Sequence, residues 1–120
     1  PLINKLILDK KAFALAMRIF EISKLFPKEE RYALIDQMRR SSRSVCANIA
    51  EGYRKRMYPK HFIAKLSDAD MENSETQVWI DFSLACEYIT KEIKEELHKK
   101  SEEVGKLVGY MVQNSEKFRK

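Results

Sequence analysis

Arginine and lysine are the side chains of this sequence best placed to do chemistry, because they are concentrated in one stretch. Residues 36–65 contain the cations Arg39, Arg40, Arg43, Arg54, Lys55, Arg56, Lys60 and Lys65, against the two carboxylates Asp36 and Glu51. A planar guanidinium group binds two phosphate oxygens at once, so this stretch indicates contacts with phosphate. Tyr53 and Tyr58 lie among these cations and could stack on the bases of a single-stranded nucleic acid.

An acidic stretch follows and supports a different interpretation. Residues 66–90 contain no Lys or Arg, and their carboxylates are Asp68, Asp70, Glu72, Glu75, Asp81 and Glu87. These acids could pair with the basic stretch, either within the chain or across an interface. Cations neutralised in this way would bind phosphate poorly. Charge placement alone therefore favours phosphate binding and self-pairing equally.

Residues that could catalyse a reaction or hold a metal are few and scattered. A di-iron site in a helical bundle needs a Glu-x-x-His pair on two helices. Glu95 and His98 form one such pair, but the only other histidine, His61, has no acid at the matching position. Cys46 and Cys86 form no CxxC motif, and the 3 glycines are too far apart for a phosphate-binding loop. We expect no catalytic residue, no metal and no cofactor.

The scarcity of turn signals indicates the fold class. The chain has 120 residues, of which 44% are hydrophobic, with only 3 glycines and 3 prolines. A β-sandwich of this length would need a turn about every ten residues. Breaks at Pro27, Gly52, Pro59 and Thr90 instead leave helical segments near 10–26, 29–52, 59–88 and 91–118. We predict one domain over residues 1–120, an all-α antiparallel up-down four-helix bundle.

Apolar residues at helical spacing predict which face of each segment is buried. In the second segment these are Leu34, Met38, Ser42, Val45, Ile49 and Tyr53, and in the fourth Ile93, Leu97, Ser101, Val104, Val108, Met111, Ser115 and Phe118. The first segment offers Phe13, Ala16, Met17 and Phe20, with Ile19, Ile22 and Phe26 on an adjoining face. Arg39, Arg40 and Arg43 then lie opposite the second stripe, within an arc of about 100°, as a ridge facing solvent.

The end of the third segment differs, because residues 78–89 are apolar almost all round. A helix that is apolar on every side is buried on every side, and a small bundle covers only one. We expect the other side, carrying Trp79 or Phe82, to form a contact between subunits of a homo-oligomer. The alternative is that the first segment or the N-terminal tail covers these rings within the same chain.

Residues 37–52 carry a specific motif. Gln37, Arg39-Arg40, Ser44 and Asn48-Ile49-Ala50-Glu51-Gly52 resemble the signature of the intervening-sequence proteins of large-subunit ribosomal RNA. The sequence departs from the family at Glu87, where a glycine commonly precedes the Tyr-Ile pair. It also departs at Asp70-Met71, where Gly-Ser is common.

This resemblance implies a four-helix bundle that assembles as a ring, often a homopentamer. A related branch, the accessory variability determinant of diversity-generating retroelements, is a basic ring that binds nucleic acid and a reverse transcriptase. The family carries no established catalytic residues. Asn48 and Glu51 flank the arginine ridge and could accept hydrogen bonds from it, and we interpret Asn48, Glu51 and Gly52 mainly as a structural helix ending.

These observations together predict a non-enzymatic homo-oligomer that binds nucleic acid, RNA in preference to DNA, through Arg39, Arg40, Arg43, Arg54, Lys55 and Arg56. The alternative is a scaffold or adaptor whose charged faces serve self-assembly and a protein partner. The choice depends on whether the acidic segment neutralises the ridge. No apolar run approaches the ~20 residues of a transmembrane helix, so we expect a cytoplasmic protein without membrane contact.

Overall fold

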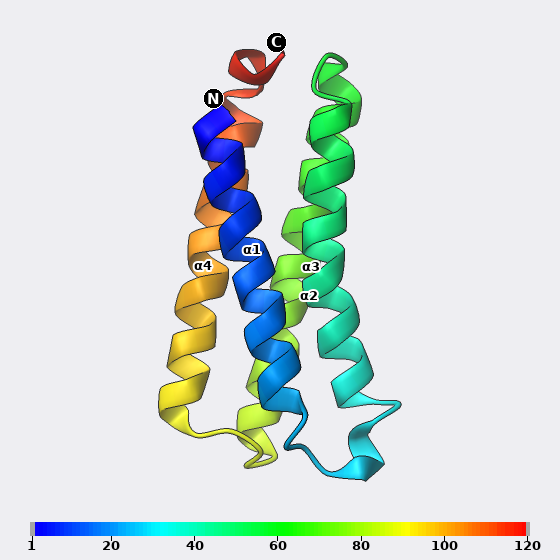
Figure 1. Cartoon of the computed structure of the whole chain (residues 1–120), viewed down its shortest axis with the longest axis vertical. Coiled ribbons are helices and arrows are strands. Elements are labelled where there is room, and N and C mark those ends of the chain that lie inside the picture. The colour runs from blue at the N-terminus through cyan, green and yellow to red at the C-terminus, as the bar shows by residue number, and fades with distance from the viewer. Residues whose placement is uncertain (1, 120) are drawn as a thin grey trace.

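The computed structural model describes residues 2–119, and within them the chain forms four α-helices that run alternately up and down (Figure 1). The helices are α1 (Leu2–Ser23), α2 (Leu34–Arg54), α3 (Pro59–Ala85) and α4 (Lys91–Gln113), with short 3₁₀ turns η1 (Lys28–Glu30) and η2 (Ser115–Phe118). The predicted all-α four-helix bundle is confirmed. It is elongated, 46 Å along its longest axis, and the α2–α3 turn lies at the same end as both termini.

Short connections place each helix beside its neighbours in the chain, as expected for an up-down bundle. α1 also packs on α4, so α1 and α3 stand at diagonally opposite corners. The closest approach is between α2 and α3, where small residues face each other. A methyl group added at Gly52 would lie 3.1 Å from Lys65 Cβ, and the Ser41 and Thr76 hydroxyl oxygens are 2.8 Å apart.

The first two helices begin at different residues from those predicted. α1 starts at Leu2 and not near residue 10, because Leu8 is fully buried in the core and Lys5 pairs with Asp9 one turn along the helix. α2 starts at Leu34 and not at residue 29, because residues 28–30 form η1. The Glu30 carboxylate then accepts a hydrogen bond from the Leu34 amide at 3.4 Å, which satisfies one free donor at the start of α2.

The starts of α3 and α4 are set by residues at or next to their first turns. Pro59 occupies the first turn of α3, and Thr90 caps α4 by accepting a hydrogen bond from the Ile93 amide. Gly52, which was predicted to end the second helix, lies within α2, which continues to Arg54. η2 then turns the chain back at the end of α4, so that Phe118 is buried against Phe62.

The core consists of two apolar clusters separated by a polar layer. One cluster lies toward the termini and the other toward the α1–α2 and α3–α4 loops. Between them, Asn73 of α3 and Ser101 of α4 exchange hydrogen bonds of 2.9 and 2.8 Å, and Gln77 donates to the Ser101 hydroxyl at 2.8 Å. These buried polar groups are therefore satisfied.

The faces predicted to be buried are correct in α2 and α4 but wrong in part of α1. Phe13 and Met17 are 63% and 41% exposed, whereas Leu8, Ala12 and Leu15 are buried. α1 is apolar on two faces, and the buried face is the one whose alanines allow neighbouring helices to approach. The second apolar face remains on the surface.

A hydrogen bond joins the two loops at the end of the bundle opposite the termini. The Tyr88 hydroxyl donates to Glu30 Oε2 at 2.8 Å, and its ring packs at 5.1 Å on that of Phe26. The hydrogen bond to Glu30 raises the pKa of Tyr88 to about 12. The Tyr88 hydroxyl therefore keeps the proton that it donates to Glu30 well above neutral pH.

Candidate nucleic-acid interface

Three of the predicted arginines line one shallow groove on the outer face of α2. The groove has a volume of about 600 Å³ and is lined by Arg31, Tyr32, Ile35, Asp36, Arg39, Arg40, Arg43, Ser44 and Ala47. Arg31 and the highly exposed Tyr32 were not predicted as site residues. They precede α2, and the helical spacing used to place the ridge does not extend to them.

Arg39 is held by the end of α1. Its Nε donates to Ser23 Oγ at 2.8 Å, a second nitrogen lies 3.5 Å from the Phe20 carbonyl oxygen, and the guanidinium stacks 4.7 Å from the Phe20 ring centre. The last carbonyls of a helix have no partner within it and carry partial negative charge. Arg39 therefore joins α2 to the C-terminal end of α1, and two of its five N–H donors are used there.

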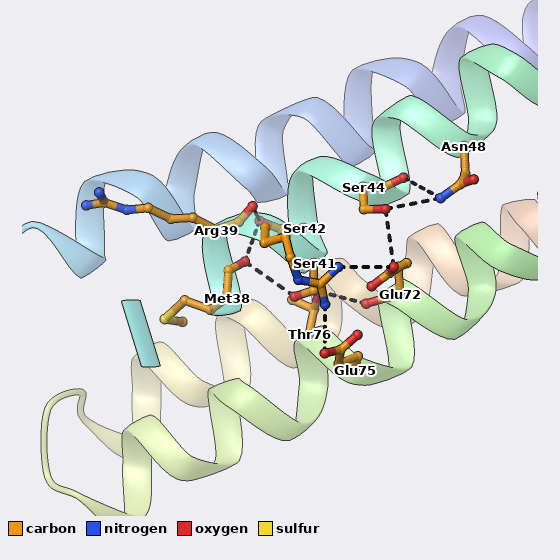
Figure 2. Close-up of polar contacts among 10 residues, drawn as sticks. Met38, Arg39, Ser41, Ser42, Ser44, Asn48, Glu72, Glu75 and Thr76 are labelled. Carbon is orange, nitrogen blue, oxygen red and sulfur yellow. Dashed lines mark hydrogen bonds and ion pairs between the residues drawn. The ribbon is translucent and has the colours of Figure 1, made fainter. Parts of the chain in front are cut away.

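Arg40 is neutralised by α3. Its guanidinium donates to Glu72 Oε2 at 3.3 Å and to Glu75 Oε1 at 2.8 Å (Figure 2 shows these two acids facing α2). Partial burial raises the pKa of the Glu75 carboxyl, but the hydrogen bonds, led by the one from Arg40, outweigh burial and lower it. The same contacts, led by that with Glu75, raise the pKa of Arg40. The acidic helix therefore does screen this part of the ridge.

Of the remaining cations, Arg43, Arg54 and Lys55 have no ion-pair partner among residues 2–119, and Arg56 contacts an aromatic ring. Arg43 is exposed, with its guanidinium 5.5 Å from the Phe20 ring centre. Arg54 and Lys55 are exposed at the end of α2, and the Lys55 ammonium lies 5.9 Å from the Tyr58 ring centre. Arg56 donates to the Tyr53 carbonyl oxygen at 3.1 Å and stacks 4.5 Å from the ring of the same residue.

The Asn-Ile-Ala-Glu-Gly motif makes contacts within the bundle. The Asn48 amide donates to the Ser44 carbonyl oxygen at 2.9 Å and to its hydroxyl at 3.1 Å, and Ser44 in turn donates to Glu72 (Figure 2). Glu51 pairs with Lys65 of α3 at 3.3 Å. Together with the close approach at Gly52, these contacts join α2 to α3.

Trp79 and Phe82 differ in exposure. Phe82 is 53% exposed, and Trp79 is half-buried with its ring centre 6.0 Å from that of Phe82. α1 stands at the diagonally opposite corner of the bundle, so it does not cover these rings. The buried Trp79 indole N–H lies near the Glu75 carboxylate and helps to lower the pKa of that group.

The histidines do not converge on a site. His98 lies 2.8 Å from Asp81, and the His61 ring packs edge-on at 6.3 Å against Tyr58. Within residues 2–119, no group of three or more His, Cys, Asp and Glu side chains is arranged to hold a metal ion. None of the helices in this range combines the length and the apolar character needed to cross a bilayer.

The fold and the motif agree with known proteins. A family model described as 23S rRNA-intervening sequence protein matches residues 4–109. The chain belongs to this family. A solved structure from Bacteroides thetaiotaomicron, described as a protein with unknown function from the S23 ribosomal protein family, shares 29% identity and a TM-score of 0.84. The match covers 92% of this chain and 99% of that chain. Comparison with curated proteins gives no match.

Family membership confirms the resemblance seen in residues 37–52. Glu87, one of the two positions at which the sequence departs from the expected pattern, adopts a φ of 64°, a left-handed conformation that favours glycine.

Proposed function

We propose that this member of the intervening-sequence family is a non-enzymatic, self-associating bundle that binds nucleic acid, RNA in preference to DNA. Of the six cations predicted for this role, Arg39 and Arg40 are engaged within the bundle, and Arg43 lies beside α1. We assign the main phosphate contacts to the other three, Arg54, Lys55 and Arg56, together with Lys60. These four cations and Tyr58 are called the turn surface below.

The observation that carries this proposal is the unneutralised charge of three cations on the turn surface, Arg54, Lys55 and Lys60. Arg54, Lys55 and Lys60 are exposed and have no ion-pair partner within residues 2–119. Glu51, the nearest carboxylate in the sequence, is already paired with Lys65. Cations without carboxylate partners contribute most to phosphate binding, because nothing within the protein competes for them.

Tyr58 adds a second component to this surface. Tyr58 is 60% exposed in the α2–α3 turn, and its ring centre lies 5.9 Å from the Lys55 ammonium. Base–aromatic stacking contributes about 1–3 kcal/mol per base in proteins that bind single strands. The turn surface therefore favours a flexible single strand, whose bases can reach the ring while its phosphates contact the cations. The family description refers to 23S rRNA, which makes RNA the first ligand to test.

The test is binding to labelled single-stranded RNA, duplex RNA and duplex DNA over a salt series. We compare the wild type with an Arg54→Ala, Lys55→Ala, Lys60→Ala triple variant. Each phosphate contact on a single strand contributes about 0.7 to the slope of log affinity against log salt, so the triple variant should lower this slope by about 2.

A matched control removes the same charge from another face. Lys94, Lys99 and Lys106 lie on α4 and have no ion-pair partner within the described residues, so replacing all three with Ala should leave the slope unchanged. Equal losses in the two variants would show a general charge effect and contradict a defined site. If the wild type fails to bind at low salt, the scaffold or adaptor alternative is favoured.

A further inference from the structure

Two neighbouring grooves lie where the α1–α2 loop leads into α2, toward the end of the bundle opposite the termini (Figure 1). One is the groove of about 600 Å³ on the outer face of α2, called the α2 groove below. The other, called the loop groove, has a volume of about 290 Å³ and is formed by the end of α1, the loop and the start of α2. Arg31, Ile35 and Arg39 line both grooves, so the two share a wall.

The loop groove is rich in cations. Among the described residues, those that line it include Lys24, Lys28, Arg31 and Arg39, and none is a carboxylate. Lys28 and Arg31 are exposed and have no ion-pair partner within residues 2–119, whereas Lys24 lies 3.4 Å from Glu21. Arg39 uses two of its five N–H donors on α1, which leaves three. Such a cluster attracts a group with more than one negative charge, such as a terminal phosphate.

The α2 groove adds an aromatic ring and a carboxylate. Tyr32 is 85% exposed and makes no ring contact or side-chain hydrogen bond within residues 2–119, so its face is available to stack on a flat ligand. Asp36, in the first turn of α2, lines the same groove, and its carboxylate has no hydrogen bond or ion pair in that range. A carboxylate repels phosphate and accepts hydrogen bonds from N–H groups.

The two grooves together therefore match the parts of a nucleotide. Phosphate fits the loop groove, and a base stacked on Tyr32 presents its edge to Asp36. Ile35, which is 8% exposed, gives the shared wall an apolar patch. The α2 groove also has the volume of a small-ligand site.

Among the RNA bases, guanine fits a carboxylate best. Its ring N1–H and its amino N–H point in the same direction, so they can donate to both oxygens of Asp36. Adenine and cytosine place an acceptor nitrogen beside their amino group, and uracil places its N–H between two carbonyl oxygens. A carboxylate is repelled by these acceptors, so Asp36 selects guanine.

We propose that the two grooves bind a guanine nucleotide that carries a terminal phosphate, with the base against Tyr32 and Asp36 and the phosphate on Lys28, Arg31 and Arg39. A free nucleotide and the 5′ end of an RNA strand both offer this chemistry, and the experiment below separates the two sources. The site lies at the opposite end of the bundle from the turn surface. It therefore goes beyond the nucleic-acid binding proposed above and does not depend on it.

The test is isothermal titration calorimetry of the protein with GMP, AMP and guanosine. GMP should bind at least about tenfold more tightly than AMP, as other bidentate base contacts discriminate, and Asp36→Asn should abolish this preference. Tyr32→Ala should weaken GMP and AMP by a similar factor, because stacking does not select a base. A Lys28→Ala, Arg31→Ala double variant should weaken GMP at least about tenfold and leave guanosine unchanged, since guanosine has no phosphate.

A matched control removes a carboxylate elsewhere. Asp68→Asn alters an exposed residue of α3 that lines neither groove, and it should bind GMP as the wild type does. The substituted side chains Lys28, Arg31, Tyr32 and Asp36 are exposed, so the variants should keep the circular dichroism and unfolding midpoint of the wild type. The comparison of GMP with AMP on the wild type needs no variant.

The two sources are separated with an RNA strand that begins with guanine, carrying either a 5′-phosphate or a 5′-hydroxyl. These strands are measured on the Arg54→Ala, Lys55→Ala, Lys60→Ala variant, so that failure at the turn surface and failure here are distinguishable. If GMP does not bind but the phosphorylated strand binds more tightly than the other, and depends on Asp36, the ligand is a strand end. The inference is overturned if neither GMP nor the phosphorylated strand binds. Equal binding of GMP and AMP, or a guanine preference that survives Asp36→Asn, also overturns it.

Discussion

At the scale of single residues, Glu87 shows a conflict between side chain and backbone. It follows the last turn of α3 with a φ of 64°, and the Tyr88 amide donates to the Ser83 carbonyl oxygen at 2.9 Å while the Glu87 amide donates to that of Leu84. This pattern closes the C-terminus of a helix and requires a left-handed residue, usually glycine. A residue with a Cβ atom is strained in this conformation.

We therefore expect Glu87→Gly to stabilise the protein by about 0.5–1 kcal/mol, because relief of the strain exceeds the extra flexibility that glycine gives to the unfolded chain. For a chain of this length, the gain corresponds to a rise in the thermal midpoint of about 2–4 °C. Glu87→Ala is the control, since it removes the charge and retains the strained Cβ. A gain as large for Ala as for Gly would assign the effect to charge.

At the scale of elements, the polar layer determines how α3 and α4 align. Asn73 and Ser101 are buried between two apolar clusters and exchange hydrogen bonds across the two helices. Sliding either helix along the other would separate these groups inside the core. An unpaired buried donor or acceptor costs about 1–3 kcal/mol, so the pair disfavours other registers.

This arrangement predicts non-additive mutations. Asn73→Ala and Ser101→Ala should each destabilise the fold by about 1–3 kcal/mol, because each leaves a buried partner without its hydrogen bond. The double variant should cost less than the sum by at least about 0.5 kcal/mol, since both partners are removed. Urea unfolding of the four proteins measures this coupling. Strict additivity would mean that the two residues act independently.

At the scale of the whole molecule, charge and apolar surface are unevenly distributed. α3 neutralises Arg40, while Arg43 has no ion-pair partner among residues 2–119 and lies beside the Phe20 ring of α1. In the proposed self-association, its charge is therefore available to an acidic surface of a second copy, such as the carboxylates of α3. Its charge would then contribute to self-association, while the turn surface at the end of the bundle stays open to nucleic acid.

Reversing this charge should weaken self-association mainly at low salt. We expect Arg43→Glu to raise the dissociation constant by about tenfold at low ionic strength, and by much less near 1 M salt, where the screening length falls to about 3 Å. Sedimentation equilibrium at both salt concentrations tests this. Lys94→Glu on α4 makes the same charge change away from Arg43 and should have no effect. A loss that is independent of salt would exclude an electrostatic contribution.

The sequence by itself determined the four helices, the buried faces of α2 and α4, and the family. α2 and α4 each have one apolar and one charged face, so helical spacing was sufficient to orient them. A proline in the first turn and a threonine N-cap act on the helix that begins beside them. Pro59 and Thr90 therefore placed the starts of α3 and α4 correctly.

Only the tertiary structure decided which face of α1 is buried and which arginines stay unpaired. α1 is apolar on two sides, so spacing alone could not choose between Phe13 and Leu15 for the core. Arg39 and Arg40 are adjacent in sequence but about 100° apart around the helix, and one faces the end of α1 while the other faces α3. Their partners come from distant parts of the chain, and such contacts exist only after the helices have packed.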